Sequence, residues 1–219
     1  MFQEKILLLK KGITDYADFA EKMLEKSLKA LSDRNERLLH DIIDKDEPIA
    51  NRREIEFDEI CINYIAQYQP VTKNLRMIIS AIKINNDLER MADHAVNIAQ
   101  NALFIVSRPF MAQLGDILKM GSIAADMFKD SIKSFVDEDM SMWKTILEKE
   151  NEVDSLKIVV TDAISAYIEK NPKNVSCALK MINIAANLER IADLTTNICE
   201  DAIYLSEGGV VKHKNASQP

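Results

Sequence analysis

Apolar residues recur every three or four positions along most of this chain, which is the period of an amphipathic helix. The stretch 71–107 shows this best, because it contains neither Gly nor Pro and places Met77, Ile84, Met91 and Ile98 on one side of a helix. An apolar stripe of this kind is stable only when it is buried against other elements. The segment is therefore predicted to be one long, partly buried helix.

Other segments show the same period and end at polar, Gly or Pro residues. A break is expected at 44–48, where Asp46 would be the N-cap of the next helix and Pro48 would lie in its first turn. Gly208 and Gly209 would stop the last helix. The predicted helical segments are 2–44, 48–68, 71–107, 110–148, 153–169 and 175–206, the fourth with a break considered near 137–139.

The third predicted helix is repeated 100 residues later in the sequence. Shared charged and amide residues are harder to obtain by chance than shared core residues, and four such positions match. We therefore predict an all-α protein of two tandem, pseudo-symmetric three-helix bundles at 1–108 and 109–207, followed by a flexible tail at 208–219. The identical pairs are Ile82/Ile182, Ile84/Ile184, Leu88/Leu188, Glu89/Glu189, Arg90/Arg190, Ala92/Ala192, Asp93/Asp193, Asn97/Asn197, Ile98/Ile198 and Ala102/Ala202.

The composition excludes several classes of protein. The formal net charge is −7 and no cluster of Lys and Arg is present, so a nucleic-acid partner is not expected. No stretch approaches the ~20 apolar residues of a membrane span, so direct membrane insertion is not expected either. The odd number of cysteines, without zinc-ligand spacing, predicts reduced cysteines in the core of a cytoplasmic protein.

Each copy of the repeat places oxygen-bearing side chains four residues apart, on nearly the same side of the helix. On a helical wheel these side chains lie opposite the apolar stripe, so packing does not account for them. Like charges at this spacing mildly destabilise a helix, and a bound cation would offset the repulsion. The candidate metal ligands are Glu89, Asp93 and Asn97 in the first copy, and Glu189, Asp193, Asn197 and Asp201 in the second.

A second set of candidate ligands lies near the predicted start of the middle helix of each half. Glu150 and Asp154 are four residues apart in the second half, and Glu47 and Asn51 occupy the corresponding place in the first. Carboxylate and amide oxygens suit Mg²⁺, Mn²⁺ or iron. The alternative interpretation is an ordinary solvated acidic face, which a single pair of this kind would favour.

An enzymatic site is not predicted. Di-iron carboxylate enzymes built on helical bundles use an inward-facing Glu-x-x-His motif, and no histidine in this chain has Glu three residues before it. His94 follows Asp93 but points about 100° away around the helix, which makes it a weak candidate ligand. No Gly-rich phosphate loop and no nucleophile elbow are present.

The two repeated motifs, at 85–94 and 186–193, resemble the duplicated Glu/Asp-x-x-x-Asp motifs of the PhoU family. Further stretches at 61–70, 75–77 and 204–208 match in order, so the resemblance covers essentially the whole chain. It implies two pseudo-symmetric three-helix bundles. It also implies multinuclear iron or zinc clusters at the carboxylate motifs of some members, and Asn51 departs from the family pattern because a second carboxylate is usual there.

The resemblance further implies a negative regulator of the phosphate-starvation response and of phosphate uptake. Such a protein would link the ATPase subunit of the phosphate ABC transporter with the phosphate-sensing histidine kinase, as a homodimer at the inner membrane. Two alternatives remain open at this point. One is a metal-storage protein or metal-dependent enzyme that uses the same carboxylates, and the other is a metal-free helical scaffold for a different transporter.

Overall fold

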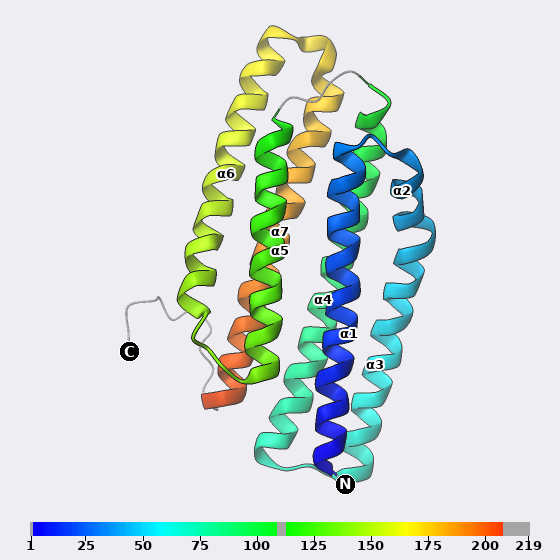
Figure 1. Ribbon diagram of the computed structural model, residues 1–219, viewed down its shortest axis with the longest axis vertical. Helices are drawn as coiled ribbons and strands as arrows, with labels where there is room; N and C mark the ends of the chain where they lie inside the picture. The colour runs from blue at the N-terminus through cyan, green and yellow to red at the C-terminus, as the bar shows by residue number, and fades with distance from the viewer. Residues whose placement is uncertain (1, 109–112, 208–219) are drawn as a thin grey trace.

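A computed structural model describes residues 2–108 and 113–207 as helices joined by short turns (Figure 1). No strand occurs in these two ranges, and the prediction of an all-α fold with two three-helix bundles is confirmed. The elements of the first half are α1 (Phe2–Ser32), α2 (Glu36–Asp41), a π-helical turn (Ile42–Asp46), α3 (Glu47–Tyr68) and α4 (Thr72–Val106). Those of the second are α5 (Leu114–Asp137), α6 (Trp143–Lys170), a 3₁₀ turn (Pro172–Asn174) and α7 (Val175–Glu207).

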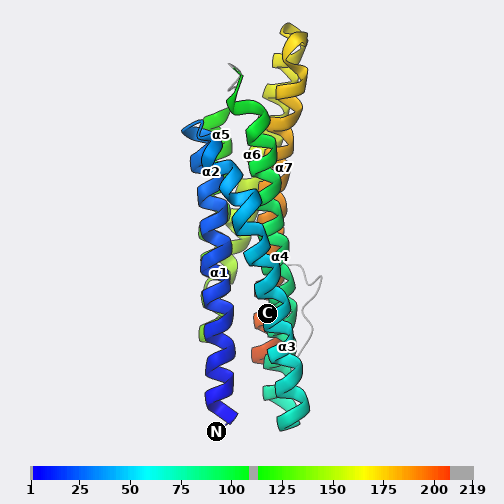
Figure 2. The same cartoon turned by 90° about the vertical axis from the view of Figure 1, so that its right-hand side faces the viewer.

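The two halves lie side by side with their long helices aligned along one axis (Figures 1 and 2). Helices α1 and α4 of the first half pack against α5 and α7 of the second, so these four helices form the middle of the molecule. Helix α3 lies on one flank, against α1 and α4, and α6 lies on the other, against α5 and α7. Each flanking helix therefore keeps one side free for solvent or for a partner.

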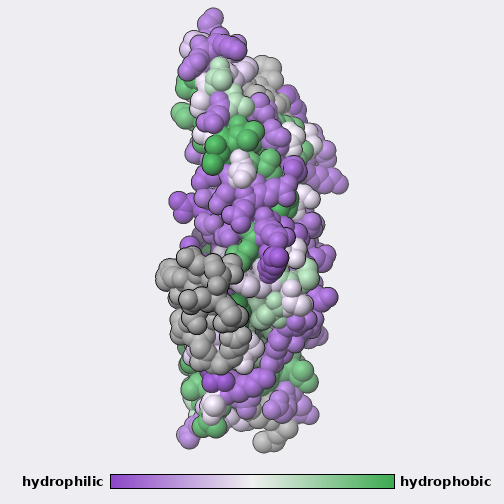
Figure 3. Space-filling model, turned by 90° about the vertical axis from the view of Figure 1, so that its left-hand side faces the viewer, coloured by the Kyte–Doolittle hydropathy of each residue, from purple (hydrophilic) through white to green (hydrophobic). Residues whose placement is uncertain are grey.

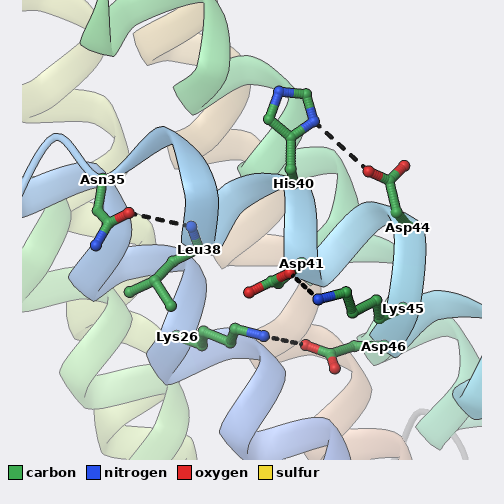
Figure 4. Close-up of polar contacts among 8 residues, drawn as sticks. All are labelled: Lys26, Asn35, Leu38, His40, Asp41, Asp44, Lys45 and Asp46. Carbon is green, nitrogen blue, oxygen red and sulfur yellow. Dashed lines mark hydrogen bonds and ion pairs between the residues drawn. The ribbon is translucent and has the colours of Figure 1, made fainter.

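The first predicted helix is wrong in its extent. The chain leaves α1 at Ser32, and the left-handed conformation of Arg34 (φ 53°) turns it into α2. The side chain of Asn35 accepts a hydrogen bond of 3.2 Å from the backbone N–H of Leu38 and so caps α2 (Figure 4). The sequence analysis missed this turn because it contains neither Gly nor Pro.

The predicted cap at Asp46 is also wrong. Asp46 has helical backbone angles and makes no side-chain cap, because α2 continues through the π-helical turn into α3 without a break. Its carboxylate instead lies 2.7 Å from the Lys26 ammonium of α1 (Figure 4). A π turn inserts a residue into a continuing helix, so the chain needs no cap at this point.

In the second half, the break predicted near 137–139 is confirmed, and Glu138 takes a left-handed conformation there (φ 55°). The next helix starts at Trp143, well before the predicted start at Val153. Glu150 and Asp154 therefore lie inside α6 rather than at its start. The polar residues just before Val153 belong to the same continuous helix and are exposed or partly exposed.

The repeat extends to the packing of the flanking helices. Ala50, Phe57 and Cys61 are the buried residues of α3, and the same spacing of seven and four recurs in α6. The buried residues of α6 in that register are Val153, Val160 and Ile164. These matches pair each residue of α3 with the residue 103 positions later in α6, and each residue of α4 with the one 100 positions later in α7.

All three cysteines are buried and free, as the sequence predicted. Burial raises the pKa of the Cys61 and Cys199 thiols to about 12, so both stay protonated near neutral pH. In residues 2–108 and 113–207, none of the helices combines the length and the apolar composition that a membrane crossing requires.

Contacts between the halves include both apolar packing and polar pairs. Gly121 of α5 lies so close to Leu28 of α1 that a Cβ atom at this position would clash with Leu28 Cδ1. At the α4–α7 seam the Lys83 ammonium lies 2.8 Å from Asp201 Oδ1. The halves are therefore held at a fixed separation by close packing at one seam and by charge pairing at the other.

Candidate metal centres

Helices α6 and α7 bring four predicted ligands of the second half together. Burial raises the pKa of Glu150, and the nearby charges of Asp193 and Asp154 raise it further. Burial likewise raises the pKa of Asp193, with Glu189 and Asp154 as its acidic neighbours. Such shifts mean that the folded protein disfavours the ionised carboxyls, which a bound cation would reverse.

One cation of the chain itself already lies beside this acidic cluster. The Lys157 ammonium of α6 lies 2.8 Å from Glu189 Oε1, and both side chains are partly exposed. A hydrogen bond between Glu150 and Thr196 opposes the rise in the Glu150 pKa. The cluster is thus partly neutralised without a metal ion.

The first half brings together a different set from the one predicted. Burial raises the pKa of Glu89, and the nearest acidic groups are Asp93 and Glu54, the latter on α3. Glu54 was missed, and it occupies the position of Lys157 in the second half. The correspondence between Glu54 and Lys157 follows from the shared spacing of the buried residues of α3 and α6. The repeated motif on α4 and α7 does not reveal it.

The other predicted ligands of the first half lie elsewhere. Asn51 is exposed and Glu47 is partly exposed, and neither is among the groups that shift the pKa of Glu89. Asn97 is exposed one turn after Asp93 on α4. Glu47 and Asn51 keep the register of Glu150 and Asp154, which lie 103 positions later, and Glu54 stands at the position of Lys157.

Asp201 does not continue the second ladder on the exposed side. It is buried (8% exposed), and it lines a polar hollow of about 510 Å³ at the α4–α7 seam together with Asn197. Its carboxylate pairs with Lys83, as described above. Helix geometry accounts for the change of side. The eight residues from Asp193 to Asp201 turn the helix by about 80° more than two full turns, so the two side chains point in different directions.

His94 faces the same seam rather than the acidic ladder. Its Nδ1 lies 2.8 Å from Asn187 Oδ1 of α7, which places the proton on Nδ1. Burial lowers the His94 pKa, and Arg190 and Arg90 lower it as well. The imidazole is therefore a neutral contact between the halves at physiological pH, as its angle on the wheel indicated.

The donor types fit a hard or borderline cation, but the arrangement is not a preformed cage. Among the residues that the structure describes, no three His, Cys, Asp or Glu side chains converge as a metal ion requires. Glu150, Asp154, Glu189 and Asp193 lie on two neighbouring helices, and Asp154 and Asp193 are exposed. Metal binding remains a prediction for these residues, and it would require their side chains to turn inward.

The fold and these two acidic faces define a class of protein: a duplicated three-helix bundle with carboxylates displayed on its outer and central helices. A family profile described as "PhoU domain" matches residues 13–102 and 117–202, one match to each half. The chain belongs to the PhoU family.

Two relatives named as PhoU homologues align with this chain over nearly their whole length. The chain is 35% identical to "Phosphate-specific transport system accessory protein PhoU homolog" of Aquifex aeolicus, covering 95% of this chain and 94% of that protein. It is 31% identical to "Phosphate-specific transport system accessory protein PhoU homolog 2" of Thermotoga maritima, with 97% and 90% covered. Both names describe an accessory protein of a transport system.

Solved structures support the same fold. The crystal structure of PhoU from Pseudomonas aeruginosa superposes with a TM-score of 0.90 at 25% identity, covering 95% of this chain and all of that chain. The phosphate transport system regulatory protein PhoU from Streptococcus pneumoniae superposes with a TM-score of 0.89. Its identity of 24% makes that second likeness an argument for the fold alone.

Proposed function

We propose that this protein is an accessory regulator of a phosphate transport system, which acts by binding partners and not as an enzyme. It would hold down the phosphate-starvation response and phosphate uptake when phosphate is plentiful. Its partners would be the ATPase subunit of the phosphate ABC transporter and the phosphate-sensing histidine kinase. These partners would keep it in the cytoplasm at the inner membrane, as a homodimer.

The near-complete alignment with the accessory protein of Aquifex aeolicus carries this proposal. A match over 95% of one chain and 94% of the other spans both bundles, which supports a shared role for the whole chain. The two flanking helices, each with one free side, supply the surfaces that an adaptor between two partners needs.

The test is deletion of the gene in the source organism, followed by an alkaline phosphatase assay on cells grown in phosphate-rich medium. High activity that returns to the low wild-type level when the gene is restored on a plasmid is the expected result. Low activity in the deletion strain would contradict a repressing role in that organism. Binding assays with purified transporter ATPase and kinase would then show whether either one is a partner.

The acidic cluster of the second half is proposed to hold the cation, as iron, zinc, Mg²⁺ or Mn²⁺. Glu150, Asp154, Glu189 and Asp193 would supply the oxygens, and the cation would remove the repulsion that adds to burial in raising the pKa values of Glu150 and Asp193. Replacing Asp193 by Ala should lower the metal content measured by elemental analysis after purification. Asp33→Ala, at the exposed turn after α1, is the matched control, and equal metal content in both variants would remove Asp193 from the ligand set.

A further inference from the structure

Helix α3 exposes large apolar side chains on the side that no other helix covers. Ile55 and Ile62 are 59% and 61% exposed, although isoleucine is among the residues most often buried. Ile55 and Ile62 are seven residues apart, which is two helical turns, so they lie on one stripe. Figure 2 shows α3 facing the viewer beside α1 and α4. This stripe is an exposed surface without an intramolecular reason to be apolar.

Carboxylates flank the same stripe, and the nearby sequence offers no cation to neutralise them. The sequence has no Lys or Arg between Arg53 and Lys73. Within the ranges that the structure describes, none of the α3 carboxylates in this stretch forms an ion pair. They are Glu56 and Glu59, which are exposed, and Glu54 and Asp58, which are half-buried on the side of α3 that faces α4.

A buried amide holds part of this acidic face in place. Asn85 of α4 is fully buried, and its Nδ2 donates hydrogen bonds to Glu54 O at 2.9 Å and to Asp58 Oδ1 at 3.0 Å. The Asp58 carboxylate is therefore fixed before any partner arrives, which reduces the entropy that binding would cost. Among the described residues, the side-chain oxygen Oδ1 of Asn85 has no hydrogen-bond partner. Burying this oxygen therefore costs free energy.

The corresponding face of the second half lacks both features. Helix α6 also exposes Ile158 (62%) and Val159 (54%), but the adjacent Lys157 pairs with Glu189. Lys119 likewise pairs with Glu152, and Ala185 stands where α4 has Asn85. In the view onto the α6 side, apolar areas are small and separated by hydrophilic ones (Figure 3). The contrast lies in the placement of cations: lysines alternate with the carboxylates of α6, whereas residues 54–72 contain carboxylates and no Lys or Arg.

We infer that the outer face of α3 is a docking site for a basic amphipathic helix of a partner protein. Leucine or similar residues of that helix would cover Ile55 and Ile62, and its Lys and Arg residues would lie against the α3 carboxylates. Nucleic acids and anionic membranes carry the same sign of charge as this face and do not fit it. The inference rests on the proposed function in one respect, because both require a protein partner.

The test uses a defined probe, an 18-residue amphipathic helical peptide of Leu and Lys with a fluorescent label. Its affinity for the full-length protein is measured by fluorescence anisotropy at low and high salt. A peptide with Glu in place of each Lys is the charge control. We expect binding of the Lys peptide, weakened by salt, and at least tenfold weaker binding of the Glu peptide, which corresponds to about 1.4 kcal/mol.

Variants assign the binding to α3. Changing Ile55 and Ile62 together to Ser keeps the charge and removes the apolar contact, so the dissociation constant should rise about tenfold. The matched control changes Ile158 and Val159 of α6 to Ser and should leave it within about twofold. Because these side chains are exposed, both variants should keep the wild-type melting temperature. Equal weakening by the two variants would overturn the inference.

A second pair of variants tests the charge contribution. Glu56→Gln with Glu59→Gln on α3 should weaken binding and flatten its salt dependence, whereas Glu148→Gln with Glu152→Gln on α6 should not. If light scattering shows a dimer that the α3 serine variant dissolves, a second copy of this chain occupies the face and the inference is wrong. Peptide binding does not depend on the outcome of the gene deletion, so the two proposals can fail separately.

Discussion

The two halves of this molecule share one fold but differ in the charged residues at matching positions of their outer helices, α3 and α6. Glu54 on α3 stands where α6 has Lys157, and Asn85 on α4 stands where α7 has Ala185. In the second half the lysine neutralises the carboxylates of α7, whereas in the first half the glutamate adds to them. After a duplication, packing restrains the buried positions, so the exposed positions are free to separate into two different surfaces.

The turns at Arg34 and Glu138, which lie at opposite ends of the molecule, also differ in their ion pairs. Arg34 and Glu138 both follow the first long helix of their half in a left-handed conformation. Glu138 accepts contacts from two lysines of the first half, Lys10 at 2.9 Å and Lys73 at 2.6 Å. Arg34 makes no ion pair in the part of the chain that the structure describes. Glu138 and the two lysines thus form an ionic latch between the halves, in addition to the Lys83–Asp201 pair at the α4–α7 seam.

The largest effect on stability is expected from adding a side chain at Gly121, where α5 packs closely against α1. Gly121→Val would place its side chain against Leu28, where even a Cβ atom would clash with Cδ1, so the free energy of unfolding should fall by about 2 kcal/mol. Urea denaturation followed by circular dichroism measures it. Gly115→Val, in the same helix with nothing within 4 Å of its Cβ position, carries the same change in helix propensity and should cost much less. Equal losses would mean that α1 and α5 do not need this close approach.

The fold could be predicted from the sequence because its main signals are local. The uninterrupted period of 71–107 is one helix in the structure, since an apolar stripe and the absence of Gly and Pro act at every residue. The turn at Arg34 was missed because it uses a left-handed arginine and an asparagine cap in place of Gly or Pro. The π-helical turn was missed because it depends on how α2 and α3 pack against α1 and α4.

The candidate site could be predicted only in part, for a different reason. The placement of Asp93 and Asp193 on the exposed side follows from helix geometry within one element. Which residue of α3 meets Glu89 depends on the register between two helices, and the motif gave no indication of Glu54, which is one of the acidic neighbours of Glu89. Register is set by the buried contacts of Ala50, Phe57 and Cys61, which a single motif does not contain.

The ionic latch gives the next largest effect. Glu138→Gln removes both ion pairs and should lower the free energy of unfolding by about 1 kcal/mol at pH 7. The two lysines hold the pKa of Glu138 below its ordinary value despite partial burial, so the contribution is present above that ordinary value and is lost as the pH falls through the folded-state pKa. The variant and the wild type should therefore become equally stable in strong acid.

The control for the latch is the matching turn of the first half. Arg34→Gln should leave the free energy of unfolding unchanged across the same pH range, because Arg34 is exposed and has no ion pair among the described residues. Urea denaturation at several pH values measures both variants. A loss that persists undiminished in strong acid would show that Glu138 acts through its backbone conformation and not through its charge.

The smallest effect is expected from substitutions that exchange the charges of Glu54 and Lys157 between the two halves. Burial and the acidic neighbours Asp93 and Glu54 raise the pKa of Glu89, so its ionised form is disfavoured in the folded protein, and stability is lost as the pH rises through that raised value. Glu54→Lys removes one repulsive neighbour and copies Lys157, so stability at pH 7 should rise by about 0.5 kcal/mol and the gain should vanish in acid. The reverse change, Lys157→Glu, should lower stability by a similar amount. If both changes shift stability in the same direction, the carboxylates of the two halves do not interact with their flanking helices as the shared register requires.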